Sequence, residues 1–249
     1  MTGAVRPAAT VVLLRDTADG LETFLMRRVA SMAFAPNMHV FPGGRVDQVD
    51  ATERVTFTTD DVAGLAARGS TDEPGIRALY SCAVRETAEE AGIVIAERDA
   101  AGRLVIDPAA LPMVDHWVTP ETESRRYDVR FFAVAVADGR ARLTTTEADE
   151  AGWIGPAAAL AAFAAGRMAM LPPTESVLER LATFTSAADF LTHAAGQPVV
   201  PLLPRRLVDG QGRSRWALVH DRTGEVVLDH VRMPHTRETD GLPASGGQS

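Results

Sequence analysis

Three glutamates stand close together in the segment Arg85–Ile93, which reads Arg-Glu-Thr-Ala-Glu-Glu-Ala-Gly-Ile. If this segment is helical, Glu86, Glu89 and Glu90 project from one face, because positions three and four apart are neighbours on a helix. Like charges at this spacing repel one another unless a cation lies between them. Carboxylate oxygens suit Mg²⁺ or Mn²⁺, ions that keep several waters and also bind substrate phosphates. The spacing indicates a divalent-metal site, and a solvated acidic helix face is the plainer alternative.

Residues near the three glutamates fit a supporting role. Arg85 precedes Glu89 by one helical turn, so an i,i+4 ion pair can fix that carboxylate. Upstream, Phe41-Pro42-Gly43-Gly44 offers two glycines whose backbone can pass close to a metal or a phosphate. We expect the helix to run from about Ile76 to Ala91 and to end at Gly92, since glycine readily takes the left-handed C-terminal position.

Together, the two stretches resemble the Nudix box, whose second half is Arg-Glu-U-x-Glu-Glu-x-Gly-U with U apolar. Thr87 and Ile93 take the U positions here. The resemblance implies that Glu86, Glu89 and Glu90 bind Mg²⁺ or Mn²⁺, with the Gly43 carbonyl as a further ligand. It also implies that Arg85 belongs to the catalytic group and that Phe41 and Gly44 contact the substrate.

The box departs from its usual form in one respect. A continuous box has a Glu six residues after its glycine and eight before its arginine, yet these counts give Asp50 from Gly44 and Arg77 from Arg85. We interpret residues 45–75 as an insertion within the box. An insertion at this place resembles the one within the boxes of a Nudix branch related to the peroxisomal acyl-coenzyme A diphosphatases. The role of the missing Glu is left open, whereas the metal-binding triplet is intact.

The composition and net charge limit the kinds of partner that the protein can bind. The net charge of −8 and pI near 5.3 argue against binding to nucleic acid or to a membrane surface, which need a basic field. The single cysteine, Cys82, excludes an intrachain disulfide framework, and no run of eighteen apolar residues or signal peptide is present. We therefore expect a cytoplasmic protein whose partner is a small molecule; a homodimer is also left open.

Hydrophobic patterns predict the strands and helices that must position these residues. Residues 8–16 are a continuous apolar run and predict a strand buried on both faces, paired through a turn with a strand at 21–28. Further strands are expected at 93–95, 129–136 and 142–143. Helices are expected at 60–68, at 156–166, from Thr174 as N-cap, and at 186–195. Strands at 215–220 and 225–230 predict a C-terminal hairpin.

Arginines and one acidic loop complete the candidate site. Arg27 and Arg28 end the second strand, and Arg125 and Arg126 precede the strand at 129–136; all four are candidates for binding substrate phosphates. The alternative is ordinary surface charge. The resemblance implies an acidic loop residue opposite the box helix, as metal ligand or base, and Glu150 is chosen over Glu147.

The predicted fold is an α/β/α sandwich with a mixed sheet: a Nudix-like domain over residues 8–195, a hairpin extension over 196–235 and a disordered tail over 236–249. The implied reaction is hydrolysis of a diphosphate bond in a nucleoside diphosphate linked to another moiety. Coenzyme A or acyl-coenzyme A is the first choice, although Asn37 and Ala33 stand where that branch has Gly and Arg. An NADH or ADP-ribose pyrophosphatase and a noncatalytic nucleotide sensor are the alternatives.

Overall fold

A mixed sheet of ten strands forms the centre of the protein. The computed structural model describes residues 4–32, 34–137 and 141–229. Its strand order is β10-β2-β1-β9-β8-β11-β12-β13, and β3 and β4 pair with β2 and β1. The strands of this sheet are β1 (Val5–Thr17), β2 (Gly20–Arg28), β3 (His39–Val40), β4 (Gly43–Arg45), β8 (Met113–Val118), β9 (Arg126–Ala135), β10 (Ala148–Ile154), β11 (Leu202–Val208), β12 (Ser214–His220) and β13 (Val226–Asp229).

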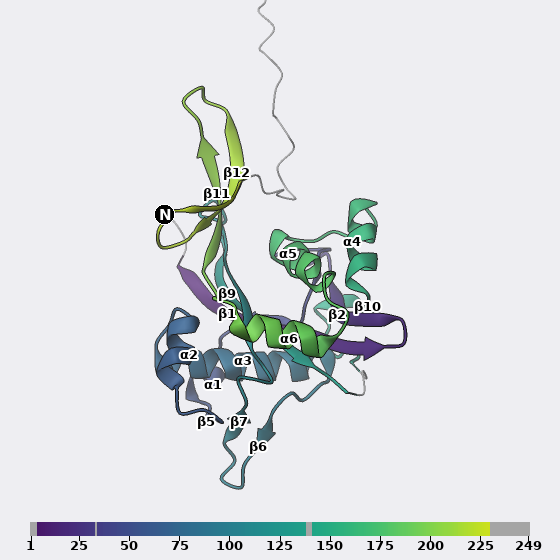
Figure 1. Cartoon of the computed structure of the whole chain (residues 1–249), viewed down its shortest axis with the longest axis vertical. Helices are drawn as coiled ribbons and strands as arrows, with labels where there is room; N and C mark the ends of the chain where they lie inside the picture. Colours follow the sequence, from purple (N-terminus) through teal and green to yellow (C-terminus); the bar gives the residue numbers. More distant parts are fainter. Residues whose placement is uncertain (1–3, 33, 138–140, 230–249) are drawn as a thin grey trace, which may run out of the picture.

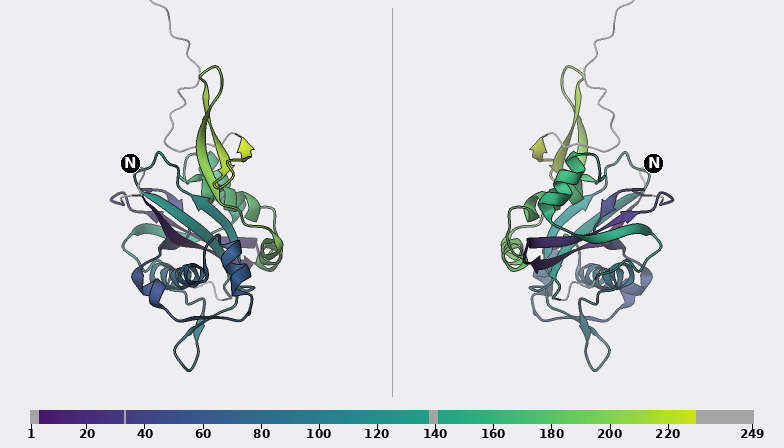
Figure 2. Two further views of the ribbon diagram at one scale, coloured as in Figure 1. Left: turned by 90° about the vertical axis from the view of Figure 1, so that its left-hand side faces the viewer. Right: turned by 90° about the vertical axis from the view of Figure 1, so that its right-hand side faces the viewer.

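Helices cover both faces of the sheet (Figures 1 and 2). On one side lies α3 (Glu73–Ala91), with α1 (Gln48–Thr52) and α2 (Val62–Arg68) against it. On the other lie α4 (Pro156–Ala164), α5 (Pro172–Leu181) and α6 (Ala187–Gly196). The predicted α/β/α sandwich with a mixed sheet is thereby confirmed.

Strand β1 shows why the sheet needs helices on both sides. Its odd-numbered residues Val11 and Leu13 enter the core formed with α3, and its even-numbered Val12 and Leu14 enter the core formed with α4, α5 and α6. All four are fully buried. The apolar run of β1 is thus explained by burial of successive side chains in two cores.

Helix α3 carries the acidic segment. It begins at Glu73, three residues earlier than predicted, because the Asp72 side chain accepts a hydrogen bond from the Gly75 N–H and a proline occupies the first turn. It ends at Gly92, whose φ of 67° is left-handed, as predicted.

Two predicted strands are wrong. Residues 93–95 pair with no other strand in the described part of the chain. Ile93 and Ile95 instead pack their side chains against the core beside α3. Residues Arg142 and Leu143 also form no strand, because their segment caps α3 instead. The N–H groups of Arg142 and Thr144 donate to the carbonyls of Ala91 and Glu90, which lack partners within the helix.

One predicted helix cap is also wrong. Leu171, not Thr174, is the N-cap of α5, because Pro172 and Pro173 occupy the first turn, where a missing N–H costs nothing.

The segment 45–75, interpreted as an insertion, packs mainly against α3. It contributes α1, β5 (Val55–Phe57) and α2, and β5 joins β7 (Leu104–Ile106) and β6 (Glu97–Arg98) in a small second sheet. From this segment, only Arg45 and Asp47 reach the cleft described below. The insertion thus supports the box helix from behind and touches the cleft only at its start.

The C-terminal strands continue the central sheet. Leu202 on β11 pairs in parallel with Trp117 on β8, and β12 then pairs with both β11 and β13. The predicted pairing of residues 215–220 with 225–230 is found, within a three-strand meander. Residues 230–249, which include the predicted tail, lie outside the described residues. Every helix in the described part of the chain is too short or too polar to span a membrane.

Candidate active site

The acidic face of α3 opens onto a long cleft. Glu86, Glu89 and Glu90 all line it, as do the glycines of the Phe41–Gly44 stretch. The three carboxylates differ in exposure: the Glu86 side chain is 13% exposed and that of Glu89 is 59% exposed, whereas Glu90 is buried. The cleft has a volume of about 1320 Å³, enough for a ligand larger than a typical drug molecule.

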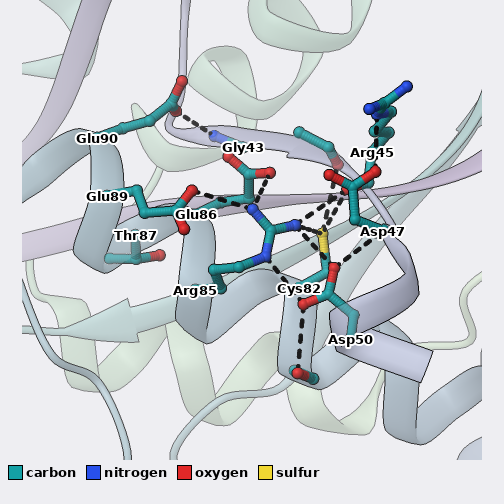
Figure 3. Close-up of polar contacts among 12 residues, drawn as sticks. Gly43, Arg45, Asp47, Asp50, Cys82, Arg85, Glu86, Thr87, Glu89 and Glu90 are labelled. Carbon is teal, nitrogen blue, oxygen red and sulfur yellow. Dashed lines mark hydrogen bonds and ion pairs between the residues drawn. The ribbon is translucent and has the colours of Figure 1, made fainter. Parts of the chain in front are cut away.

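Arg85 lies at the centre of this acidic face (Figure 3). Its Nη1 donates to Glu86 at 2.7 Å and to Glu89 at 3.0 Å, so the predicted Arg85–Glu89 pair is present. Its Nε and Nη2 bind both oxygens of Asp50, at 3.0 and 2.7 Å. A bidentate pair of this kind fixes the plane of the guanidinium group and hence the carboxylates it contacts.

Asp50 is a site residue that the sequence reasoning missed. It is 1% exposed and also closes a reciprocal capping box with Asp47 at the start of α1. The signal was present, since Asp50 stands six residues after Gly44, where the usual box has a Glu. The shorter aspartate supplies the same carboxylate because α1 brings its backbone close to α3.

Glycine is required at positions 43 and 44 because other atoms lie too close to the backbone there to leave room for a Cβ. The N–H of Gly43 donates to Glu90 Oε2 at 2.7 Å. A Cβ on Gly44 would overlap the Glu86 carboxylate, and one on Gly43 would overlap the Ala9 carbonyl of β1. Phe41 is buried, with its ring edge against Phe131, and anchors this loop in the core beside α5. The loop is thereby held directly against the acidic face of α3.

Burial makes the acidic face electrostatically unfavourable when it is fully ionised. It raises the pKa of Glu86, and it raises the pKa of Glu90 to about 7. Neighbouring carboxylates act in the same direction: Glu86 and Glu147 on Glu90, and Glu89 on Glu86. A bound divalent cation would relieve this repulsion.

The donor set fits Mg²⁺ or Mn²⁺ in chemistry, although the carboxylates are now held by protein donors. Across residues 4–32, 34–137 and 141–229, no three acidic, histidine or cysteine side chains converge closely enough to enclose an ion. Arg85 and the Gly43 N–H take carboxylate oxygens that a metal would use. Mg²⁺ completes its shell with waters and substrate phosphates, so it does not need a closed protein cage.

The loop acid nearest the helix is Glu147. Glu150 lies on β10 beside Arg27 of β2, with 3.1 Å between the charged atoms, and it does not line the cleft. Glu147 does line the cleft, and its position follows from the cap on α3: Thr144 is tied to Glu89 and Glu90, and Glu147 lies three residues further on. The structure therefore brings Glu147, and not Glu150, to the acidic face.

The four predicted arginines also differ in whether they line the cleft. Arg27 binds Asp149 at 2.8 Å and Glu150 and does not line the cleft, whereas Arg28, Arg125 and Arg126 do. Arg28 lies 3.8 Å from Glu147, and its buried Nε has no hydrogen-bond partner among the described residues. Arg28 is therefore a cation with a free donor close to Glu90 and Glu147.

Cys82 lies just behind the acidic face. It is fully buried, with its Sγ 3.3 Å from the Arg45 carbonyl, and burial raises the pKa of its thiol. A buried thiol with a raised pKa is a poor nucleophile, so Cys82 acts here as a small packing residue.

Comparison with known proteins gives two informative relatives. A curated protein of Caenorhabditis elegans named "Putative nudix hydrolase 7" is 28% identical over 193 residues, which are 73% of this chain and 62% of that protein. The crystal structure of a NUDIX hydrolase from Alicyclobacillus acidocaldarius is 28% identical with a TM-score of 0.65, and the match covers 80% of this chain and 100% of that one. No family model matches the chain. The chain thus spans about three fifths of its curated relative.

Proposed function

Because this chain belongs to the Nudix hydrolase superfamily, we propose that it hydrolyses the diphosphate bond of a nucleoside diphosphate linked to another moiety. The observation that carries this proposal is the acidic face of α3, where three glutamates, the Gly43 N–H and Arg28 gather at one end of a long cleft. Carboxylates for a metal, together with cationic and backbone donors for phosphate oxygens, are the groups that such chemistry needs.

Glu86, Glu89 and Glu90 would hold Mg²⁺ or Mn²⁺, which when bound neutralises phosphate oxygens and acidifies a coordinated water. The protein's own groups do the rest. Arg85, held by Asp50, orients Glu86 and Glu89. Glu147 accepts the proton of the attacking water. Attack at one phosphorus breaks its bond to the bridging oxygen, so each product keeps one of the two phosphates of the diphosphate.

Coenzyme A or an acyl-coenzyme A remains our first choice of substrate. The inserted box supports it by resemblance, and Arg28, Arg125 and Arg126 in the cleft are suited to an anionic substrate. An NADH or ADP-ribose type substrate is the alternative. We expect a cytoplasmic location and a small-molecule partner.

A panel of substrates tests this function. With Mn²⁺ present, kcat/KM is measured for coenzyme A, dephospho-coenzyme A, NADH and ADP-ribose, and coenzyme A is expected to lead. Glu90→Gln should lower kcat by about two orders of magnitude, since it removes a charged ligand at constant volume. Glu179→Gln, an exposed change on α5, is the matched control.

Two outcomes would contradict the proposal at different levels. Better cleavage of dephospho-coenzyme A or ADP-ribose than of coenzyme A would reject the substrate and leave the chemistry standing. Tight nucleotide binding without turnover of any substrate would favour the other class of protein, a noncatalytic nucleotide sensor.

A further inference from the structure

Three arginines that line the cleft come from three neighbouring strands of the central sheet. Arg45 of β4 pairs with Ala8 of β1, and Arg6 stands two residues before Ala8 on the same strand. Arg125 directly precedes β9, which pairs in parallel with β1 from Val5 onward. All three arginines line the cleft. Because neighbouring strands lie about 4.8 Å apart, these long side chains can reach a common group. We call Arg6, Arg45 and Arg125 the arginine cluster.

The register of the strands puts the cluster over one face of the sheet. Residues that pair across two strands share a face, and so do residues two apart on one strand. Arg45 and Arg6 therefore share the face of Ala8. Tyr127 of β9 pairs with Arg6 and lies beside it on that face. Arg125 stands two residues before Tyr127 and lines the same cleft.

Two members of the cluster have no carboxylate partner. Arg6 and Arg125 are exposed, and neither forms an ion pair with any residue that the structure describes. Glu123 also lines the cleft, yet it pairs with neither of them. Arg45 pairs with Asp47 at 2.8 Å (Figure 3). Unpaired arginines that gather in a cleft, in a chain of net charge −8, suit an anion, and the guanidinium group matches phosphate oxygens.

The cluster lies a short way along β1 from the acidic face. Gly44, whose backbone lies against the Glu86 carboxylate, pairs with Ala9 of β1. Arg6 is three residues from Ala9, a separation of about 10 Å between the backbones. The arginine side chain can close part of this distance. A phosphate on the ribose of a nucleotide is separated from the diphosphate by the sugar ring, which suits this spacing.

We propose that the arginine cluster binds a phosphate monoester on the ribose of the substrate, outside the diphosphate that is cleaved. The inference rests on the proposed function for the position of the diphosphate. It defines the substrate class more narrowly, as a nucleoside diphosphate derivative with a third phosphate at the 2′ or the 3′ position. Arg6 and Arg125 are then specificity-determining residues, because they contact the one group that distinguishes such a substrate from its dephosphorylated form.

Matched pairs of substrates test the phosphate site. With Mn²⁺ present, kcat/KM is measured for coenzyme A against dephospho-coenzyme A and for NADPH against NADH, since the members of each pair differ by one ribose phosphate. The wild type should prefer the phosphorylated member of at least one pair by about tenfold or more, the size expected for a charge-assisted hydrogen bond. The pair with the larger preference shows whether the phosphate is at the 3′ or the 2′ position.

Variants of the two unpaired arginines connect this preference to the cluster. Arg6→Gln and Arg125→Gln should each reduce it severalfold by raising KM for the phosphorylated substrate, and the double variant should abolish it with kcat unchanged. Arg167→Gln, the same change of charge at an exposed arginine outside the cleft, should keep the full preference. Calorimetry on the intact protein measures binding separately, with adenosine 3′,5′-bisphosphate, its 2′,5′ isomer and adenosine monophosphate.

The outcomes separate this inference from the proposed function. If the wild type cleaves both members of each pair equally well, the phosphate site is wrong and the proposed function stands. If the double variant loses the same activity on both members of a pair, the cluster contacts a part common to both, which also overturns the inference. If no substrate is cleaved, but a bisphosphate binds more tightly than the monophosphate and the double variant removes this difference, the proposed function has failed and the phosphate site stands.

Discussion

Arg85 donates hydrogen bonds to three carboxylates, and these bonds fix the positions of most side chains on the acidic face. It binds Asp50 with two nitrogens and shares its third with Glu86 and Glu89. Glu90 is excluded from this set and is held by the Gly43 N–H instead. The four carboxylates therefore have distinct environments, although their types are nearly the same.

Glu147 and Glu150 give a test at the scale of single residues. Glu147→Gln should lower kcat by about a hundredfold, a typical loss for a general base, because its carboxylate lines the cleft near Glu90. Glu150→Gln should retain nearly the wild-type rate, because its carboxylate pairs with Arg27 away from the cleft. Steady-state rates of both variants with Mn²⁺ decide between them; a large loss in Glu150→Gln alone would restore the choice made from the sequence.

Between elements, the buried Asp50 joins α1 to Arg85 of α3 by an ion pair of 2.7 Å. Asp50→Asn should destabilise the protein by about 3 kcal/mol, because Arg85 would lose the buried carboxylate that fixes it. It should also reduce kcat, since Glu86 and Glu89 lose their orienting partner. Unfolding in denaturant and steady-state rates measure the two effects.

An exposed aspartate serves as the control for this variant. Asp60→Asn, in the same inserted segment, should change neither stability nor rate. A variant Asp50→Asn with full stability and full activity would show that the Asp50–Arg85 pair has no positioning role.

Strands β8 and β9 carry a buried histidine that should make stability depend on pH. His116 binds Asp128 through Nε2, and its buried Nδ1 has no partner among the described residues, so a proton there would lack an acceptor. Burial lowers the pKa of His116 below its ordinary 6.5. The unfolded chain therefore takes up the proton first, so the contribution is complete above pH 6.5 and is lost as pH falls below it.

The expected slope is at most about 1.4 kcal/mol per pH unit from this group. Unfolding free energies between pH 7.5 and 5.5 measure it, and His116→Gln should flatten the curve. An equal slope in His116→Gln and the wild type would assign the pH dependence to other groups.

At the scale of the whole molecule, metal binding should increase the free energy of unfolding. The acidic face forms only when α1, α3 and the Phe41–Gly44 loop are assembled, so a metal bound there favours the folded state. Mn²⁺ at a hundred times its Kd should add about 2.7 kcal/mol to the unfolding free energy. Glu90→Gln should lose most of this gain and Glu179→Gln none; an undiminished gain in Glu90→Gln would place the metal elsewhere.

Local spacing was enough to predict much of this protein. The helix with Glu86, Glu89 and Glu90, its stop at Gly92 and the doubly buried strand β1 follow from periodicities of a few residues, which act within one element. The strands expected at 93–95 and 142–143 failed because strand pairing needs a neighbour, which no local pattern reports.

Only the folded chain decided the remaining site. Asp50 reaches Arg85 across 35 residues, Glu147 takes its position from a cap on the end of α3, and Trp216 joins the cleft because β11 pairs with β8. Each of these contacts joins elements far apart in the chain. These contacts depend on how the cores pack and not on any single stretch. The spacing of residues could therefore indicate the chemistry but not which of Glu147 and Glu150 lines the cleft.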